Sequence, residues 1–289
     1  MTDQPKVAYQ GQPGAYSHLA CVAAAPDHEP MPCYSFEDML SAVQDGTADL
    51  AMVPVENSVA GRVADIHHLL PESGLFIIGE HFQRVNHMLL GLKGATLAGL
   101  KEVHAHPQGL AQCRKLIQQY GLKRMQHADN AGAARDVAEW SDPSIAAIAS
   151  SLAAEVYGLE ILADSVEDFE HNTTRFLVMS RAPKLPPVTT DKVVTTIVFR
   201  VRSVPAALYK ALGGFATNGI NLTKLESYLV GGSFEAAQFY VDAEGHPDER
   251  NMALALEELK FFCPPDAVRI LGTYPMSPFR ASAARPEGD

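Results

Sequence analysis

Polar side chains fill the segment His171–Arg175, and the apolar segment Phe176–Met179 follows at once. A short apolar run flanked by polar residues predicts a buried strand. The hydroxyl, amide and guanidinium groups then stand at a strand end, where α/β proteins bind their ligands. A polar turn without a ligand is the alternative. Groups of the same kind at other strand ends would favour a site.

Other junctions between a predicted strand and the next helix or loop also carry hydroxyls, amides or charged groups: Gly11–Ser17, Pro54–Arg62, His106–Gln112 and Ser150-Ser151. A glycine-bearing turn before a helix, as at Gly11–Ser17, offers backbone N–H groups to an anion. Each junction alone fits ordinary turn chemistry, but their repetition in one α/β region predicts a single convergent cleft. The sequence has no Ser-His-Asp order, dinucleotide fingerprint or Walker loop.

Composition limits the partners of this chain of 289 residues, whose net charge is -11. This charge argues against nucleic acid and anionic membranes, which require clustered Lys and Arg. The polar start Met1–Pro5 and the absence of a long apolar run predict a cytoplasmic protein. The scattered cysteines, without a CxxC pair, predict free thiols rather than zinc or disulfides. For His104 and His106 we expect no metal, and we place His106 in the cleft.

Strands and helices alternate up to Ser180, which predicts an α/β fold with parallel or mixed sheets. Ser35 with Asp38 has the spacing of a capping box. Pro107 is expected at the first position of a helix that runs to Tyr120.

The prolines of segment 183–192 predict a linker. After it the pattern restarts as βαββαβ, the ferredoxin-like order, with a turn at Gly231-Gly232 before a strand over Phe234–Val241. We therefore expect a first domain over 1–182, a second over 193–275, and a disordered tail over 276–289.

The motifs that carry a family resemblance are Gly11-x-Pro13-Gly14-Ala15-Tyr16-Ser17, Pro54-Val55-Glu56-Asn57-Ser58-x-x-Gly61, His106-Pro107-Gln108 with Gln112, Ala146–Tyr157, and Asn172-x-Thr174-Arg175-Phe176. In this order they resemble prephenate dehydratase. The later segments Leu208–Leu212 and Ile220–Ser227 resemble the ACT regulatory domain of such enzymes. The resemblance extends over about residues 5 to 275.

The resemblance implies a bilobal catalytic domain similar to type 2 periplasmic binding proteins, with hinges near 80–85 and 164–175 and the site between its lobes. It implies conversion of prephenate to phenylpyruvate, water and carbon dioxide in phenylalanine biosynthesis, without a cofactor. It also implies phenylalanine as an effector and a homodimer or homotetramer formed through the ACT domains.

Site residues follow from the same resemblance. The implied catalytic residues are Thr174, Asn57, Glu56 and Gln112. The implied substrate-binding residues are Arg175, Ser58, Gly14, Ala15, Ser17, Gln108, His106, Phe176, Asn172 and Thr173. The implied allosteric residues are Ala207, Leu208, Asn218, Ile220, Asn221, Leu222, Glu226 and Ser227.

Two of these residues carry the expected chemistry. By resemblance, Thr174 donates to the departing hydroxyl, and Glu56 or His171 are candidates to supply its proton. We expect Arg175 to pair with a substrate carboxylate, because its guanidinium can donate two parallel hydrogen bonds. A structural ion pair is the alternative for Arg175.

The chain departs from the family pattern in places. Ala105 stands where a serine is common, and Tyr228-Leu229 replace an Arg-Pro pair that marks the phenylalanine site. The second departure leaves open whether phenylalanine inhibits. Two other functions also stay open: arogenate dehydratase, and a non-catalytic amino-acid sensor.

Overall fold

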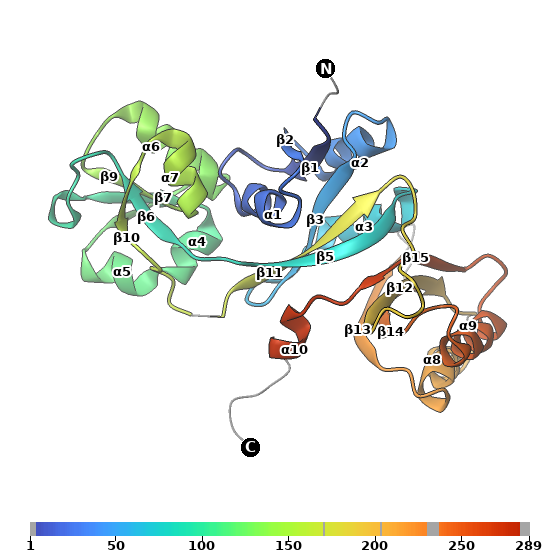
Figure 1. Ribbon diagram of the computed structural model, residues 1–289. Helices are drawn as coiled ribbons and strands as arrows, with labels where there is room; N and C mark the ends of the chain where they lie inside the picture. The colour runs from blue at the N-terminus through green and yellow to red at the C-terminus, as the bar shows by residue number, and fades with distance from the viewer. Residues whose placement is uncertain (1–3, 170, 203, 230–236, 284–289) are drawn as a thin grey trace. The chain divides into compact units, whose positions relative to one another are not determined.

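The computed structural model describes residues 4–169, 171–202, 204–229 and 237–283. The chain forms two compact units, which are described in turn (Figure 1). Unit 1 comprises Met1–Leu69 and His81–Phe176, and unit 2 comprises Leu70–Glu80 and Leu177–Asp289. Among the described residues, no helix has both the length and the apolar character that a bilayer crossing requires.

The first sheet has the strand order β2-β1-β3-β11-β5, with β4 paired to β3. Its strands are β1 (Lys6–Gln10), β2 (Glu29–Cys33), β3 (Leu50–Asn57), β4 (Gly61–Arg62), β5 (Phe76–Arg84) and β11 (Thr173–Ser180), and its helices are α1 (Tyr16–Ala24), α2 (Phe36–Gln44) and α3 (Ala64–Glu72). The predicted capping box of α2 is confirmed, because Ser35 Oγ accepts from Asp38 N and the Asp38 carboxylate accepts from Ser35 N. The buried strand predicted at Phe176–Met179 is confirmed, and it extends from Thr173 to Ser180.

The second sheet has the order β10-β6-β9-β7-β8. Its strands are β6 (Met88–Gly91), β7 (Glu102–Ala105), β8 (Lys123–Gln126), β9 (Ile145–Ala149) and β10 (Glu160–Ala163); its helices are η1 (Leu97–Gly99), α4 (Pro107–Gln112), α5 (Arg114–Gln119), α6 (Asn130–Trp140) and α7 (Ser151–Tyr157). Parallel and antiparallel pairs both occur in it, so the expected mixed α/β fold is confirmed. The chain passes between the two sheets over 85–87, 164–169 and 171–172. The hinges near 80–85 and 164–175 stay a prediction.

The single helix predicted from Pro107 to Tyr120 is wrong, because the helix breaks at Cys113 into α4 and α5. The cause is Asp168, which is distant in sequence. Its backbone N–H donates to Gln112 O at 2.6 Å, and its carboxylate accepts from the N–H groups of Arg114 and Lys115 at 3.0 Å. Asp168 thus ends one helix and caps the next, and leaves Gln112 at the end of α4.

Unit 2 confirms the predicted βαββαβ order (Figure 1). Its elements are β12 (Val193–Arg200), α8 (Ala207–Thr217), β13 (Leu222–Leu229), β14 (Ala237–Glu244), α9 (Arg250–Phe262) and β15 (Val268–Pro275), and the sheet order is β13-β14-β12-β15 with antiparallel pairs. Side chains of α8 and α9 pack with one face of the sheet in a buried apolar core. The predicted Gly231-Gly232 turn and the first residues of the predicted Phe234–Val241 strand lie outside the described residues.

The disordered tail predicted over 276–289 is wrong for its first part, where the helix α10 (Phe279–Ala283) forms; residues 284–289 lie outside the described residues. Arg280 holds this segment to two carboxylates of unit 2. Its guanidinium donates to Glu80 at 2.7 and 2.8 Å and lies 3.4 Å from Asp242. Both carboxylates are fully buried. Burying two carboxylates is costly without a cation, so the ion pairs of Arg280 with Glu80 and Asp242 explain why this segment is ordered.

Removing this cation should destabilise unit 2. We expect Arg280→Met to lower the free energy of unfolding by about 3–5 kcal/mol, because it takes the guanidinium away from two buried carboxylates. Urea unfolding measures the change. Arg250→Met is the matched control: Arg250 is exposed at the start of α9, and its loss should cost less than about 0.5 kcal/mol. Equal effects of the two changes would contradict the assigned role of Arg280.

Candidate active site

A hydrogen-bonded network joins side chains from three distant segments of unit 1. Asn57, at the end of β3, donates from Nδ2 to Asn172 Oδ1 at 2.7 Å and to Thr174 Oγ1 at 2.9 Å. Asn172 in turn donates from Nδ2 to Gln112 Oε1 at 2.9 Å. The structure therefore brings together three of the four predicted catalytic residues, Asn57, Gln112 and Thr174, with Asn172.

Arg175 and Glu56 form a separate pair. Successive side chains of a strand point to opposite faces, so Arg175 lies on the other face of β11 from Thr174, as Glu56 does on β3 from Asn57. Arg175 Nη1 lies 3.2 Å from Glu56 Oε1, and the arginine side chain is only 2% exposed. This geometry favours the structural ion pair, which the sequence left as the alternative, over a carboxylate ligand beside Thr174.

Other predicted binding residues hold the polar segment in place. Ser58 Oγ donates to His171 O at 2.6 Å and accepts from Thr173 N at 2.9 Å, and Ser58 N donates to Thr173 O. Phe176 is fully buried. These contacts fix the backbone on both sides of Asn172, so they position the network without requiring that Ser58, Thr173 or Phe176 touch a ligand.

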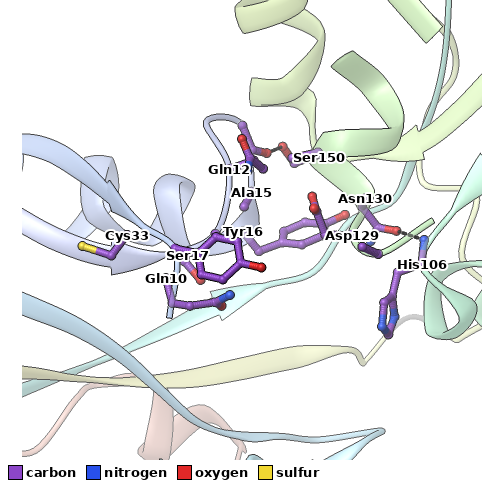
Figure 2. Close-up of a pocket in the computed structure, with 15 residues that line it drawn as sticks. Gln10, Gln12, Ala15, Tyr16, Ser17, Cys33, His106, Asp129, Asn130 and Ser150 are labelled. Carbon is purple, nitrogen blue, oxygen red and sulfur yellow. Dashed lines mark hydrogen bonds between the residues drawn. The ribbon is translucent and has the colours of Figure 1, made fainter. Parts of the chain in front are cut away.

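A cavity of about 570 Å³ lies between the start of α1 and the second sheet. Figure 2 shows residues of β1, α1 and the loop between them on one wall and His106, Asp129 and Asn130 on the other. His106 N donates to Asn130 Oδ1 at 2.8 Å. The predicted residues Gly14, Ala15, Ser17 and His106 all line the cavity. Gln108 is exposed outside the lining.

The electrostatics of the cavity come from helix ends. Its lining contains one carboxylate, Asp129, and neither lysine nor arginine. Helix α1 begins at the cavity, its N-cap Ala15 provides no side-chain cap, and its first turn has no acidic residue. The unpaired N–H groups of that turn and the positive end of the helix dipole are suited to an anion.

Gly14 docks this loop against α7. Its φ of 85° is left-handed, and a Cβ there would lie 2.8 Å from Ala153 Cα. Gly14 O accepts from Ser150 Oγ at 2.5 Å, and Pro13 O accepts from Tyr157 at 2.8 Å. Only glycine fits both the backbone conformation and the close approach, so the loop that presents the α1 N–H groups has a fixed position.

Two residues that the sequence did not select connect the cavity to the network. Tyr16 lines the cavity, and its Oη lies 2.8 Å from His87 Nδ1. His87 Nε2 lies 2.7 Å from Gln112 Oε1. Burial lowers the pKa of His87 and raises that of Tyr16 well above its ordinary value. Tyr16 is part of the motif Gly11–Ser17, which could have indicated it as a site residue. His87 lies at the start of a segment with a strand pattern, and nothing in the sequence indicated it as a site residue.

A two-sheet α/β unit with a network of neutral donors beside a cavity at a helix N-terminus defines an enzyme or binding protein for a small anionic ligand. Comparison with known proteins narrows this class. The family described as prephenate dehydratase matches residues 7–184.

Individual relatives extend the match beyond that range. A bifunctional N-acyl-homoserine lactone acylase/prephenate dehydratase of Komagataeibacter europaeus is 54% identical over 97% of this chain and 99% of its own length. Arogenate dehydratase/prephenate dehydratase 1 of Arabidopsis thaliana is 38% identical over 94% and 72%. The structure of a prephenate dehydratase from Arthrobacter aurescens in complex with L-Phe is 30% identical with a TM-score of 0.84, covering 98% of this chain and 92% of that one. The chain belongs to the prephenate dehydratase family and is a dehydratase.

Proposed function

We propose that this chain converts prephenate to phenylpyruvate, water and carbon dioxide. The observation that carries the proposal is the bond from Asn57 to Thr174. Asn57 Oδ1 accepts from the backbone N–H groups of Val59 and Ala60 at 3.0 and 2.8 Å. The amide nitrogen must therefore face Thr174, whose oxygen accepts this bond. The hydroxyl proton of Thr174 is left to donate to a substrate.

The reaction needs a donor of this kind. Loss of the ring carboxylate as carbon dioxide supplies the electron pair that makes the ring aromatic and expels the hydroxyl. The dianion takes up one proton overall, and hydroxide leaves as water. A hydrogen bond from Thr174 to the leaving oxygen stabilises the charge that develops there. Glu56 lies on the opposite face of the sheet, so we propose hydrogen bonding by Thr174 rather than a proton relay from Glu56.

Variants of Thr174 test the proposal. With prephenate as substrate and phenylpyruvate formation as the signal, we expect Thr174→Ala to lower kcat by about 10²–10³, as for the loss of one donor to a developing oxyanion. Thr174→Ser should keep a large part of the rate, because it keeps the hydroxyl. Thr47→Ala, an exposed threonine of the same unit, serves as control. Near-wild-type turnover of Thr174→Ala would rule out this role.

Arogenate is a second candidate substrate, and Asp129 is the observation in its favour. Arogenate carries an ammonium where prephenate carries a keto group, and Asp129 is the single carboxylate of the cavity lining. Its Oδ1 already accepts from Gly132 N at 2.7 Å as the cap of α6, which leaves its other oxygen for a cation. The name of the Arabidopsis relative includes both arogenate dehydratase and prephenate dehydratase.

A comparison of the two substrates decides between them. If arogenate is the substrate, Asp129→Asn should lower kcat/KM for arogenate about tenfold or more, since a charge-assisted bond is worth about 1.5–3 kcal/mol, and spare prephenate. Asparagine keeps the helix cap, so the fold is retained. Asp136→Asn, on α6 outside the lining, is the control. Turnover of prephenate alone, insensitive to Asp129→Asn, would dismiss arogenate.

Two further outcomes of this assay are informative. Binding of either compound without turnover would indicate the non-catalytic sensor. The name of the Komagataeibacter relative includes an acylase, so an N-acyl-homoserine lactone is assayed alongside. If its amide is cleaved, the Thr174 variants show whether both reactions use the same site.

We further propose that unit 2 is an ACT regulatory domain, with phenylalanine as effector at the turn between α8 and β13. The proposal is supported by its βαββαβ order and by the L-Phe complex of the Arthrobacter relative. Ala207 and Leu208 begin α8, Asn218, Ile220 and Asn221 lie in the turn, and Leu222, Glu226 and Ser227 lie on β13. Asn218 Nδ2 donates to Glu258 and Gly214 O at 3.0 and 2.8 Å, which orders the turn. A homodimer or homotetramer formed through this unit is part of the proposal.

Calorimetric titration of the full chain with L-phenylalanine tests the effector. We expect saturable binding that lowers turnover, and about tenfold weaker binding for Asn221→Ala, whose exposed side chain can be removed without unfolding the unit. Asp248→Ala, also exposed in unit 2, is the control. Absence of heat and of inhibition would show that the replacement by Tyr228-Leu229 removes the effector site.

A further inference from the structure

The network can be oriented atom by atom from its fixed end. Because Asn57 Oδ1 is held by two backbone N–H groups, its nitrogen donates to Asn172 Oδ1. Asn172 must then present its own nitrogen to Gln112 Oε1. An amide oxygen cannot donate, so Gln112 Oε1 is an acceptor.

This orientation determines the protonation of His87. Its Nε2 lies 2.7 Å from Gln112 Oε1. At this distance an unprotonated Nε2 and an oxygen acceptor would repel each other, so a proton must lie between them. Nε2 therefore carries the proton, in the neutral and in the charged imidazole alike. Rotating the Gln112 amide would bring its nitrogen against Asn172 Nδ2. The bond from Asn57 fixes the Asn172 amide, so two donors would then face each other.

The other side of the ring contacts Tyr16. Burial lowers the pKa of His87, against weaker opposing effects of Gln112 and Glu167, so the neutral ring has a bare Nδ1 that accepts from Tyr16 Oη at 2.8 Å. The same hydroxyl lies within donating distance of Asn86 O, at 2.8 Å, and its single proton can bond to only one of these two acceptors at a time. The backbone N–H of His87 donates to Glu167 at 2.8 Å. Protonation of Nδ1 would turn the Tyr16 hydroxyl to Asn86 O and leave the bond to Gln112 unchanged.

The oriented network presents only donors. The side-chain oxygens of Asn57, Asn172 and Gln112 all receive hydrogen bonds, and His87 Nδ1 faces the Tyr16 hydroxyl. Two donor groups have no partner among the described residues: the hydroxyl proton of Thr174 and the amide nitrogen of Gln112, which is not a buried atom. A dianion is matched by such an arrangement without any cation.

We infer that His87, held by Tyr16, is a positioning residue that pins the oxygen of Gln112, so that the Gln112 amide and the Thr174 hydroxyl face the substrate as donors. The inference rests on the proposed dehydration of a dianionic substrate. Without His87, the Gln112 oxygen keeps only the bond from Asn172, so the side chain is held at one point and its amide nitrogen is directed at the substrate less firmly.

The first test is spectroscopic and needs no substrate. In the full-length chain labelled with ¹⁵N at histidine, the His87 resonances are assigned by their loss in His87→Gln. We expect Nε2 to be protonated and Nδ1 bare at neutral pH. A bare Nε2 would reverse the network and overturn the inference, whatever the enzyme's activity.

The second test is a double-mutant cycle on kcat/KM for prephenate. His87→Leu should lower kcat/KM by about tenfold to a hundredfold, as small misplacements of catalytic groups do. The double variant His87→Leu with Gln112→Ala should be no slower than Gln112→Ala alone, because His87 acts through Gln112. His87→Gln, which can keep an N–H near the position of Nε2, should recover part of the loss.

The control is His104→Gln. His104 is buried like His87 and bonds to His127 rather than to the network, so its loss reports the cost of removing a buried imidazole. Stability of each variant is measured by urea unfolding. Additive losses in the cycle, or a loss in His87→Leu that only follows stability, would overturn the inference. If the wild type turns over no substrate, the proposed function fails while the spectroscopic result still decides the orientation.

Discussion

The orientation of the Asn57 amide is the constraint on which the site depends. Two backbone N–H groups, of Val59 and Ala60, hold its oxygen, so the turn after β3 decides which atom meets Thr174. Each hydrogen bond of the chain Asn57–Asn172–Gln112 allows only one orientation of the next side-chain amide. The backbone turn after β3 thereby determines that the Thr174 hydroxyl on β11 acts as a donor.

Much of the fold followed from local patterns, and the site did so only in part. Alternating segments, the capping box at Ser35 and the βαββαβ order depend on neighbours in sequence. The break at Cys113 depends on Asp168 and the order in α10 on Glu80, which no local pattern contains. Arg175 shows a limit of motif reading, since adjacent strand residues face opposite sides and a motif can join one residue for chemistry with another for packing.

In the proposed function, this acidic chain binds an anion through neutral groups. Arg175 is paired and buried, and the cavity lining has no cationic side chain, so attraction comes from amide and hydroxyl donors and from the end of α1. Neutral donors attract an anion less over distance than arginine does. They also hold a departing carboxylate less tightly, which suits a reaction that destroys a charge as carbon dioxide leaves.

Asp168 and Asn172 both form hydrogen bonds with Gln112. Asp168 N donates to the backbone oxygen of Gln112, and Asn172 Nδ2 donates to its side-chain oxygen. The contacts of Asn57 with Asn172 and Thr174 span 115 and 117 residues. Closing such long loops costs chain entropy that only the assembled sheet repays. During synthesis on the ribosome, β3 and α4 emerge long before Asp168, Asn172 and Thr174. The donor groups therefore meet only after nearly all of unit 1 has been made.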